Sequence, residues 1–185
     1  MILPIVAYGD PVLKKAGDEI DENYPGLKEL IDNMFQTMYG SNGVGLAAPQ
    51  VDKSIRLFII DATPYADEDK KLEGLKKVFI NPITLEEEGK EWIFNEGCLS
   101  IPGIREDVSR KPKVLIEYYD ENFNLHEEYY EGLAARIIQH EYDHIEGVLF
   151  TDRINPFKRR LLKGKLNDIT NGNVDVDYKM KFPKK

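Results

Sequence analysis

The residues with the clearest chemical potential in this 185-residue chain are two histidines four positions apart, His140 and His144. Residues at this spacing lie on one face of a helix, so both imidazoles can bind one metal ion. Glu141 completes the pattern His-Glu-x-x-His, in which the carboxylate can act on a water activated by the metal. The alternative is that both histidines only cap or pack the helix. The adjacent glutamate favours a metal site.

A catalytic ion usually has three protein ligands and an open fourth position. Cys98, the one cysteine of the chain, is the candidate third ligand, because it follows Gly97 in a turn-like segment where the backbone can approach an ion. A lone cysteine is otherwise most often a small buried hydrophobic residue. His126 could close the site as a fourth ligand, but its place in the outer half of a predicted hairpin favours a surface histidine.

The helix that positions the histidines is predicted over residues 132–146, before Gly147. Apolar periodicity predicts a further helix over 25–39, and a third helix is predicted to begin after Asn155 with an inner face of Phe157, Leu161, Leu162, Leu166 and Ile169. Strands are predicted over 55–61, 76–81, 113–119 and 125–130, and the alternation after Gly172 predicts a closing strand. These elements show no regular βαβ alternation. We therefore expect one α+β domain over 1–185, with mixed or antiparallel strands packed around the central His-Glu-x-x-His helix.

Composition limits the classes of protein to which the chain can belong. The longest apolar runs are far shorter than the roughly 18 residues of a membrane helix, and no signal peptide is evident at the N-terminus. A single cysteine excludes an internal disulfide and fits a reducing compartment. We expect a cytoplasmic protein without membrane contact.

Charge is distributed unevenly along the chain. Residues 156–185 carry nine Lys and Arg against three Asp, a net charge of +6, although the whole chain has a net charge of −8. Such a basic end can contact a polyanion or can be a solvated helix face with a frayed tail.

Three segments resemble the motifs of the peptide deformylase family, in the family's order and spacing: Gly43–Gln50, Glu96–Ser100 and Gln139–His144. The likeness extends from Asp10 to Phe150. His-Glu-x-x-His also occurs in metalloproteases, where the third ligand normally lies downstream. No histidine follows His144 in this chain.

The resemblance implies an enzyme of protein biosynthesis that removes the formyl group from the N-terminal formyl-methionine of new polypeptides and releases formate. Cys98, His140 and His144 would bind one divalent ion, with Fe(II) as the expected native metal and zinc, nickel or cobalt as possible occupants. Glu141 would take a proton from the attacking water and pass it to the leaving amine. The Gln50 side-chain amide and the Leu99 backbone N–H would stabilise the oxyanion.

Substrate contacts follow from the same resemblance. An extended peptide could pair like an added strand with the backbones of Val44, Gly45 and Gly97. An apolar pocket for the methionine side chain is expected from Phe94, Leu133 and Ile137.

Two arginines leave alternatives open. Arg136 lies on the same helix face as the expected pocket, so either its stem lines the pocket while its charge reaches water, or the pocket is shallower than usual. Arg105 resembles a basic position that faces the peptide in relatives, or is an ordinary exposed arginine.

Two rival functions remain at this level. One is a zinc metallopeptidase, because an activated water can also attack a peptide carbonyl. The other is a non-catalytic ribosome-associated module with a structural metal, which would need neither Glu141 nor Gln50. The predicted partners are formyl-methionyl nascent peptides and, through the cluster Lys158–Arg160, the surface of the ribosome.

Overall fold

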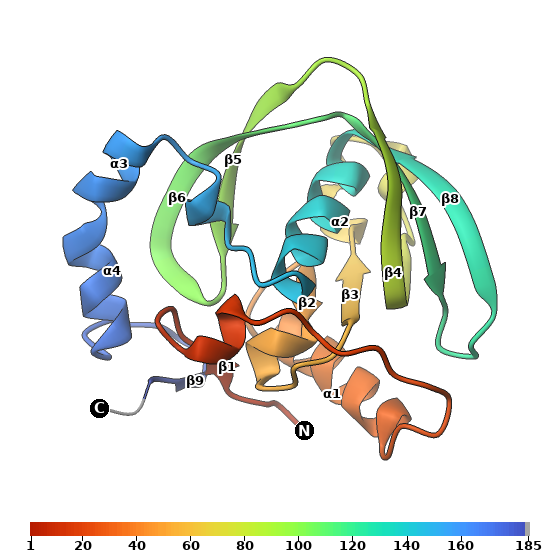
Figure 1. The fold of residues 1–185 in the computed structure, drawn as a ribbon, viewed down its shortest axis with the longest axis horizontal. Helices are drawn as coiled ribbons and strands as arrows, with labels where there is room; N and C mark the ends of the chain where they lie inside the picture. The colour runs from red at the N-terminus through yellow and green to blue at the C-terminus, as the bar shows by residue number, and fades with distance from the viewer. Residues whose placement is uncertain (184–185) are drawn as a thin grey trace.

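The largest sheet of the computed structural model, which describes residues 1–183, has five strands in the order β2-β3-β4-β7-β8 (Figure 1). All neighbouring strands are antiparallel. Their bounds are Gly45–Ala47, Leu57–Asp61, Lys76–Glu88, Lys113–Tyr119 and Leu125–Glu131. Four of the predicted strands thus lie in one antiparallel sheet, and the α+β fold class is confirmed.

Helices cover both faces of this sheet because side chains alternate along each strand. Phe58 and Ile60 of β3 face the helix α2, Gly132–Ile145, whereas Leu57 and Ile59 face the helix α1, Leu27–Gly40. The apolar stripe predicted for α1 is buried against the second set. The sheet therefore separates two apolar clusters, one for each helix.

Helix α2 is central, as predicted. It lies between the main sheet and a hairpin formed by β5, Trp92–Cys98, and β6, Ile101–Arg110 (Figure 1). Ala135, Ile138 and Ile145 of α2 are fully buried against the sheet. Because the hairpin covers another side, polar residues of α2 are buried as well and need polar partners: Arg136, Gln139, Glu141, Asp143 and His144.

The hairpin corrects one prediction. Residues 95–100 were expected to form a turn-like segment, but Gly97 and Cys98 belong to β5, and only Leu99 and Ser100 separate it from β6. The polar and glycine residues of β5 show no apolar alternation, so the sequence concealed the strand.

The C-terminal part departs from the expected single helix. Asn155 caps the N-terminus as predicted, accepting the N–H of Phe157 at 2.8 Å. However, α3 spans only Pro156–Leu161, and after Leu162 a separate helix, α4, spans Lys163–Thr170. Phe157 and Leu161 are 65% and 69% exposed, so their predicted inward position is wrong. Because the helix is interrupted, the apolar stripe is not continuous, and only the α4 residues Leu166 and Ile169 are buried.

The two ends of the described chain meet in a parallel pair of short strands, β1, Ile5–Val6, and β9, Met180–Lys181 (Figure 1). The alternation after Gly172 therefore yields only a two-residue strand, although Val174, Met180 and Phe182 do pack against a third apolar cluster. Short 3-10 turns complete the structure at Pro11–Lys14, Ala48–Val51, Thr63–Tyr65, Lys70–Leu72 and Phe150–Asp152. Within residues 1–183, the helices are too short or too polar to cross a membrane.

Candidate metal centre and substrate cavity

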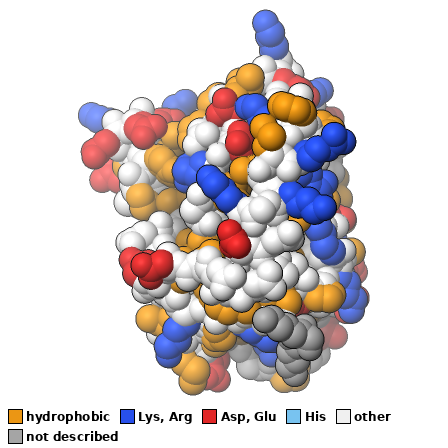
Figure 2. Space-filling view, turned by 90° about the vertical axis from the view of Figure 1, so that its left-hand side faces the viewer, with side chains coloured by type: hydrophobic (Ala, Val, Ile, Leu, Met, Phe, Trp, Pro, Cys, Tyr) orange, Lys and Arg blue, Asp and Glu red, His pale blue; other side chains and the backbone are white. Residues whose placement is uncertain are grey.

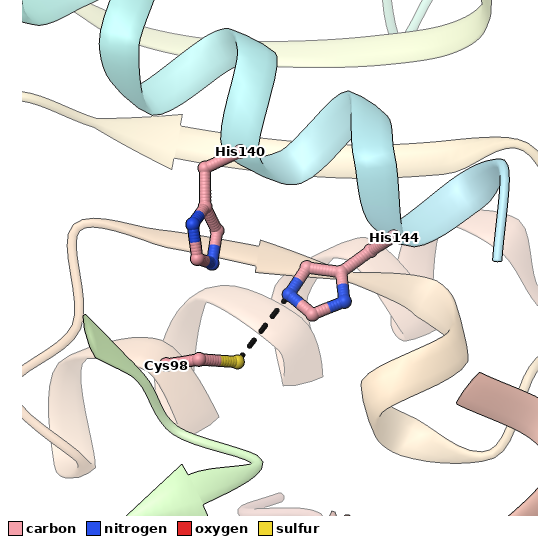
Figure 3. A group of neighbouring side chains, drawn as sticks. All are labelled: Cys98, His140 and His144. Carbon is pink, nitrogen blue, oxygen red and sulfur yellow. Dashed lines mark hydrogen bonds between the residues drawn. The ribbon is translucent and has the colours of Figure 1, made fainter. Parts of the chain in front are cut away.

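The structure brings the three predicted metal ligands together. His140 and His144 project from the same side of α2 toward Cys98 at the end of β5 (Figure 3). One ligand atom from each residue lies within 4.8 Å of the others, and Cys98 Sγ is 3.4 Å from His144 Nε2. One thiolate and two imidazoles suit borderline to soft divalent ions, so this donor set fits Fe(II), zinc, nickel or cobalt.

Glu96 fixes the orientation of the first histidine. Its Oε1 lies 2.8 Å from His140 Nδ1, which we assign as the donor, so His140 Nε2 is left available to an ion. A carboxylate on the second ring nitrogen is typical of metal-ligating histidines. Burial alone would raise the pKa of Glu96, but hydrogen bonds from His140 and Arg110 hold it well below its usual range.

The charge of Glu96 is balanced by two buried arginines. Arg110 donates to both carboxylate oxygens of Glu96, at 2.7 and 3.0 Å, and to Asp143 at 2.8 Å. Arg136 donates to Glu96 at 2.8 Å and to the carbonyls of Val108 and Trp92. Of the two alternatives for Arg136, the one in which its charge reaches water is wrong, because its partners are inside the protein and the residue is only 2% exposed.

The roles of Glu96 and Arg110 were missed at the level of sequence. One signal was available for Glu96: it lies two residues before the candidate ligand Cys98, in the same motif, and in the structure both side chains reach α2. Arg110 and Asp143 offered no comparable local signal, because their pairing joins the far end of β6 to the helix.

Glu141 is buried beside the metal ligands. It is 5% exposed, and its Oε2 has no hydrogen-bond partner among the described residues. Burial raises the pKa of Glu141 to about 7. Gly45 of β2 lies directly against the carboxylate, where a Cβ atom would be 2.5 Å from Oε1. The carboxyl group is thus placed to exchange a proton with a small molecule in the cavity.

Gln50 is held with its amide toward the ligands. Its Oε1 accepts the N–H of Ala47 at 3.0 Å, and its Nε2 donates to Ser100 Oγ at 3.2 Å and approaches Cys98 Sγ at 3.5 Å. The side chain is 2% exposed. Burial and these contacts fix the amide before any substrate binds.

A cavity of about 890 Å³ opens over this centre. It is lined by most of the predicted site residues: Val44, Gly45, Gln50, Phe94, Gly97, Cys98, Leu99, Arg105, Arg136, Ile137, His140 and Glu141. Leu133 is not among these lining residues and packs, partly buried, against the apolar cluster between α2 and the sheet. The lining also includes a segment that the sequence did not indicate, Asp175–Tyr178.

Arg105 and His126, for which the sequence left alternatives open, are each held by a hydrogen-bonded partner. Arg105 is anchored to Asn95, donating to its side-chain oxygen at 3.0 Å and to its backbone carbonyl at 2.8 Å. His126 lies on the β7–β8 hairpin, 2.7 Å from Asp120 and stacked on Tyr118, as expected for a histidine outside the metal site.

The Polypeptide deformylase family model matches residues 2–160. The chain belongs to this family. A relative named peptide deformylase from Christiangramia forsetii is 60% identical over 99% of this chain and 97% of its own length. The crystal structure of peptide deformylase from Plasmodium falciparum is 37% identical, covers 91% of this chain and 95% of its own, and has a TM-score of 0.81. A Met-Ala-Ser-bound deformylase from Acinetobacter baumannii is 35% identical, covers 83% of this chain and 99% of its own, and has a TM-score of 0.75.

Membership of the deformylase family establishes the activity. The protein is a hydrolase that removes the N-formyl group from nascent peptides. The family is metal-dependent, and the Cys98, His140 and His144 cluster is a possible metal site within the described part of the chain.

Proposed function

We propose that Cys98, His140 and His144 hold one divalent ion, natively Fe(II), and that the surrounding residues carry out deformylation of formyl-methionyl peptides. A divalent ion bound there supplies Lewis acidity, which lowers the pKa of water at the site. The observation that carries the proposal is the position of Glu141, a buried carboxyl group with an unpartnered oxygen next to the three ligand atoms.

Glu141 acts as the general base and then as the general acid. Its raised pKa matches this task, because a group that titrates near neutral pH can both accept and return a proton. It takes a proton from water as the water attacks the formyl carbon. It then gives a proton to the nitrogen of the leaving amine, which frees the peptide and formate.

Gln50 and Leu99 stabilise the negative charge that develops on the formyl oxygen. The Gln50 amide and the Leu99 N–H belong to two segments that meet at Ser100, since Gln50 Nε2 donates to Ser100 Oγ. Both donors are fixed by the fold, so no reorganisation is needed as the charge forms.

The cavity accounts for recognition of an extended peptide. Val44, Gly45 and Gly97 offer backbone groups on its walls, and Phe94 and Ile137 offer apolar surface for the methionine side chain. The charge of Arg136 is neutralised by Glu96, so Arg136 contributes its stem to the lining without a free charge. Binding of Met-Ala-Ser by the Acinetobacter baumannii enzyme supports the same mode here.

One assay tests the metal and the reaction together. The protein is purified without oxygen, its bound metal is measured, and formate release is followed with formyl-Met-Ala-Ser. We expect near-stoichiometric iron, formate release, and loss of activity in air as the metal and the Cys98 thiolate oxidise. Cleavage of the Met-Ala bond, or equal lifetimes of the iron form with and without oxygen, would contradict the proposal.

We also propose that the protein acts in the cytoplasm and contacts the ribosome through α3 and α4. Lys and Arg side chains gather on the face that carries these helices, beside exposed hydrophobic side chains (Figure 2). Lys158, Arg159 and Arg160 are all exposed, although Lys158 lies 3.5 Å from Glu106 and Arg159 lies 3.2 Å from Asp152. Arginine and lysine on one exposed face can bind RNA phosphates.

The test measures ribosome binding over a salt series. The parent should bind weakly, with an affinity that falls log-linearly with salt, and the variant with all three residues changed to glutamate should bind less. Hydrolysis of a free formyl tripeptide should stay near normal in that variant. Unchanged binding would show that these residues serve only as a solvated surface.

A further inference from the structure

The segment Asp175–Tyr178 lies between α4 and β9 in the chain and forms one wall of the cavity. It is held on its C-terminal side by the β1–β9 pair, in which the N–H of Ile5 donates to the carbonyl of Lys179 at 2.9 Å. On its N-terminal side, Val174 packs against the third apolar cluster. The segment therefore has a fixed position against the metal centre.

Tyr178 reaches from this segment to the turn that carries Cys98. Its hydroxyl donates to the carbonyl of Leu99 at 2.8 Å. The next carbonyl, that of Ser100, accepts the N–H of Tyr8 at 2.9 Å. Both terminal segments thus hold the two-residue turn between β5 and β6, one through a side chain and one through the backbone.

The orientation of this turn matters because Leu99 lies between Cys98, a candidate metal ligand, and Ser100, whose hydroxyl accepts a hydrogen bond from Gln50. The register of the hairpin shifts between Gly97 and Cys98, so the strand ladder alone does not fix the Leu99 peptide groups. Peptide units are planar, and a hydrogen bond to the Leu99 carbonyl restrains the ψ angle of Leu99 and the rotation of the whole turn.

We propose that Tyr178 is a positioning residue for deformylation, whose hydroxyl fixes the turn so that the Leu99 N–H is aimed at the reacting carbonyl oxygen. The inference rests on the proposed role of Leu99 in the oxyanion site. The C-terminal segment is then part of the catalytic apparatus, although it contributes no metal ligand.

The test is Tyr178→Phe, which keeps the ring on the cavity wall and removes only the donor. We expect kcat to fall roughly 3- to 10-fold, the range that corresponds to the loss of one hydrogen bond, with little change in KM or metal content. Tyr129→Phe is the matched control, because the Tyr129 hydroxyl bonds Glu86 at 3.1 Å on an exposed part of the sheet. That control should keep the parent kcat.

A second measurement separates structure from catalysis. In zinc-loaded protein labelled with carbon-13 and nitrogen-15, the carbonyl resonance of Leu99 should shift in Tyr178→Phe and should not shift in Tyr129→Phe. A parent-like kcat in Tyr178→Phe, or an effect on KM alone, would overturn the inference.

Gln50→Ala distinguishes failure of the inference from failure of the oxyanion assignment. If Gln50→Ala lowers kcat while Tyr178→Phe does not, the oxyanion site stands and the role of Tyr178 is wrong. If kcat is normal in both variants, the oxyanion assignment fails and the inference fails with it.

Discussion

The carboxylate of Glu96 lies 2.8 Å from Nδ1 of His140 and accepts hydrogen bonds from both buried arginines, Arg110 and Arg136. One acidic side chain therefore orients a metal ligand and pairs with two cations beneath the cavity, of which Arg110 also pairs with Asp143. A glutamine at position 96 could still accept a hydrogen bond from His140. It could not balance the positive charge of the arginines.

Glu96→Gln should weaken both metal binding and the fold. Loss of a carboxylate partner of a ligating histidine typically lowers metal affinity by roughly 10- to 100-fold. Arg136 would lose its carboxylate partner, and leaving a buried charge without its counter-charge costs about 3–5 kcal/mol of unfolding free energy. Chelator competition and thermal unfolding measure the two effects. Glu91→Gln is the control, since Glu91 is exposed and accepts only the hydroxyl of Ser109 in the described structure.

Replacing any one of Cys98, His140 and His144 with alanine should remove most of the bound metal. Two remaining ligands do not hold an ion well, because three protein ligands are the usual minimum for a catalytic site. Elemental analysis after dialysis is the measurement. His126→Ala should retain the full metal content, since His126 bonds Asp120 on the β7–β8 hairpin. Stoichiometric metal in Cys98→Ala would exclude the thiolate as a ligand.

Glu141→Gln should keep the metal and lose turnover. The amide has the shape of the carboxylate but cannot accept the proton, and general acid–base groups contribute roughly 100- to 10,000-fold. Glu146→Gln is the control, because Glu146 follows the last residue of the same helix and pairs with Arg56 at 2.7 Å near the surface. The measurement is kcat of both variants in steady-state kinetics with formyl-Met-Ala-Ser. Turnover at the parent rate in Glu141→Gln would show that another group transfers the proton.

Gly45→Ala should displace Glu141, the proposed general base, without changing any of the three metal ligands. The new Cβ atom would lie 2.5 Å from Glu141 Oε1, so the carboxylate must move. A displacement of about 1 Å in a catalytic group can cost roughly 100-fold in rate. The expected result is low kcat with normal metal content.

Gly164→Ala is the matched control for that change. Gly164 lies in α4 with no atom within 4 Å of the position of an added Cβ. Alanine there should leave kcat unchanged and raise stability by about 0.5–1 kcal/mol, because alanine loses less conformational entropy in a helix. A Gly45→Ala enzyme as active as Gly164→Ala would show that Glu141 tolerates displacement.

Much of the fold was readable from local patterns. The stripe of α1, four of the five strands of the main sheet and the histidine pair of α2 follow from periodicities of 3.6 and 2 residues. The remaining strand, β2, lies in the glycine-rich segment and was not predicted. The third helix and the closing strand were only partly predictable, because their lengths depend on which surfaces the rest of the molecule offers. The strand β5 was hidden, because the apolar Ile93 on its outer face is exposed while the charged Glu96 on its inner face is buried against α2.

The sequence by itself determined that His140, Glu141 and His144 share one side of a helix, because helix geometry acts within four residues. It also carried the three motifs by which the family is recognised. Only the tertiary structure decided that Glu96 and Arg110 lie behind His140 and that Arg136 is buried. It also decided that Leu133 packs against the core and that Tyr178 bonds the Leu99 carbonyl. Each of these contacts joins residues far apart in the chain. Their partners are chosen by how the hairpin, the central helix and the C-terminal segment pack, and local residue spacing does not encode that choice.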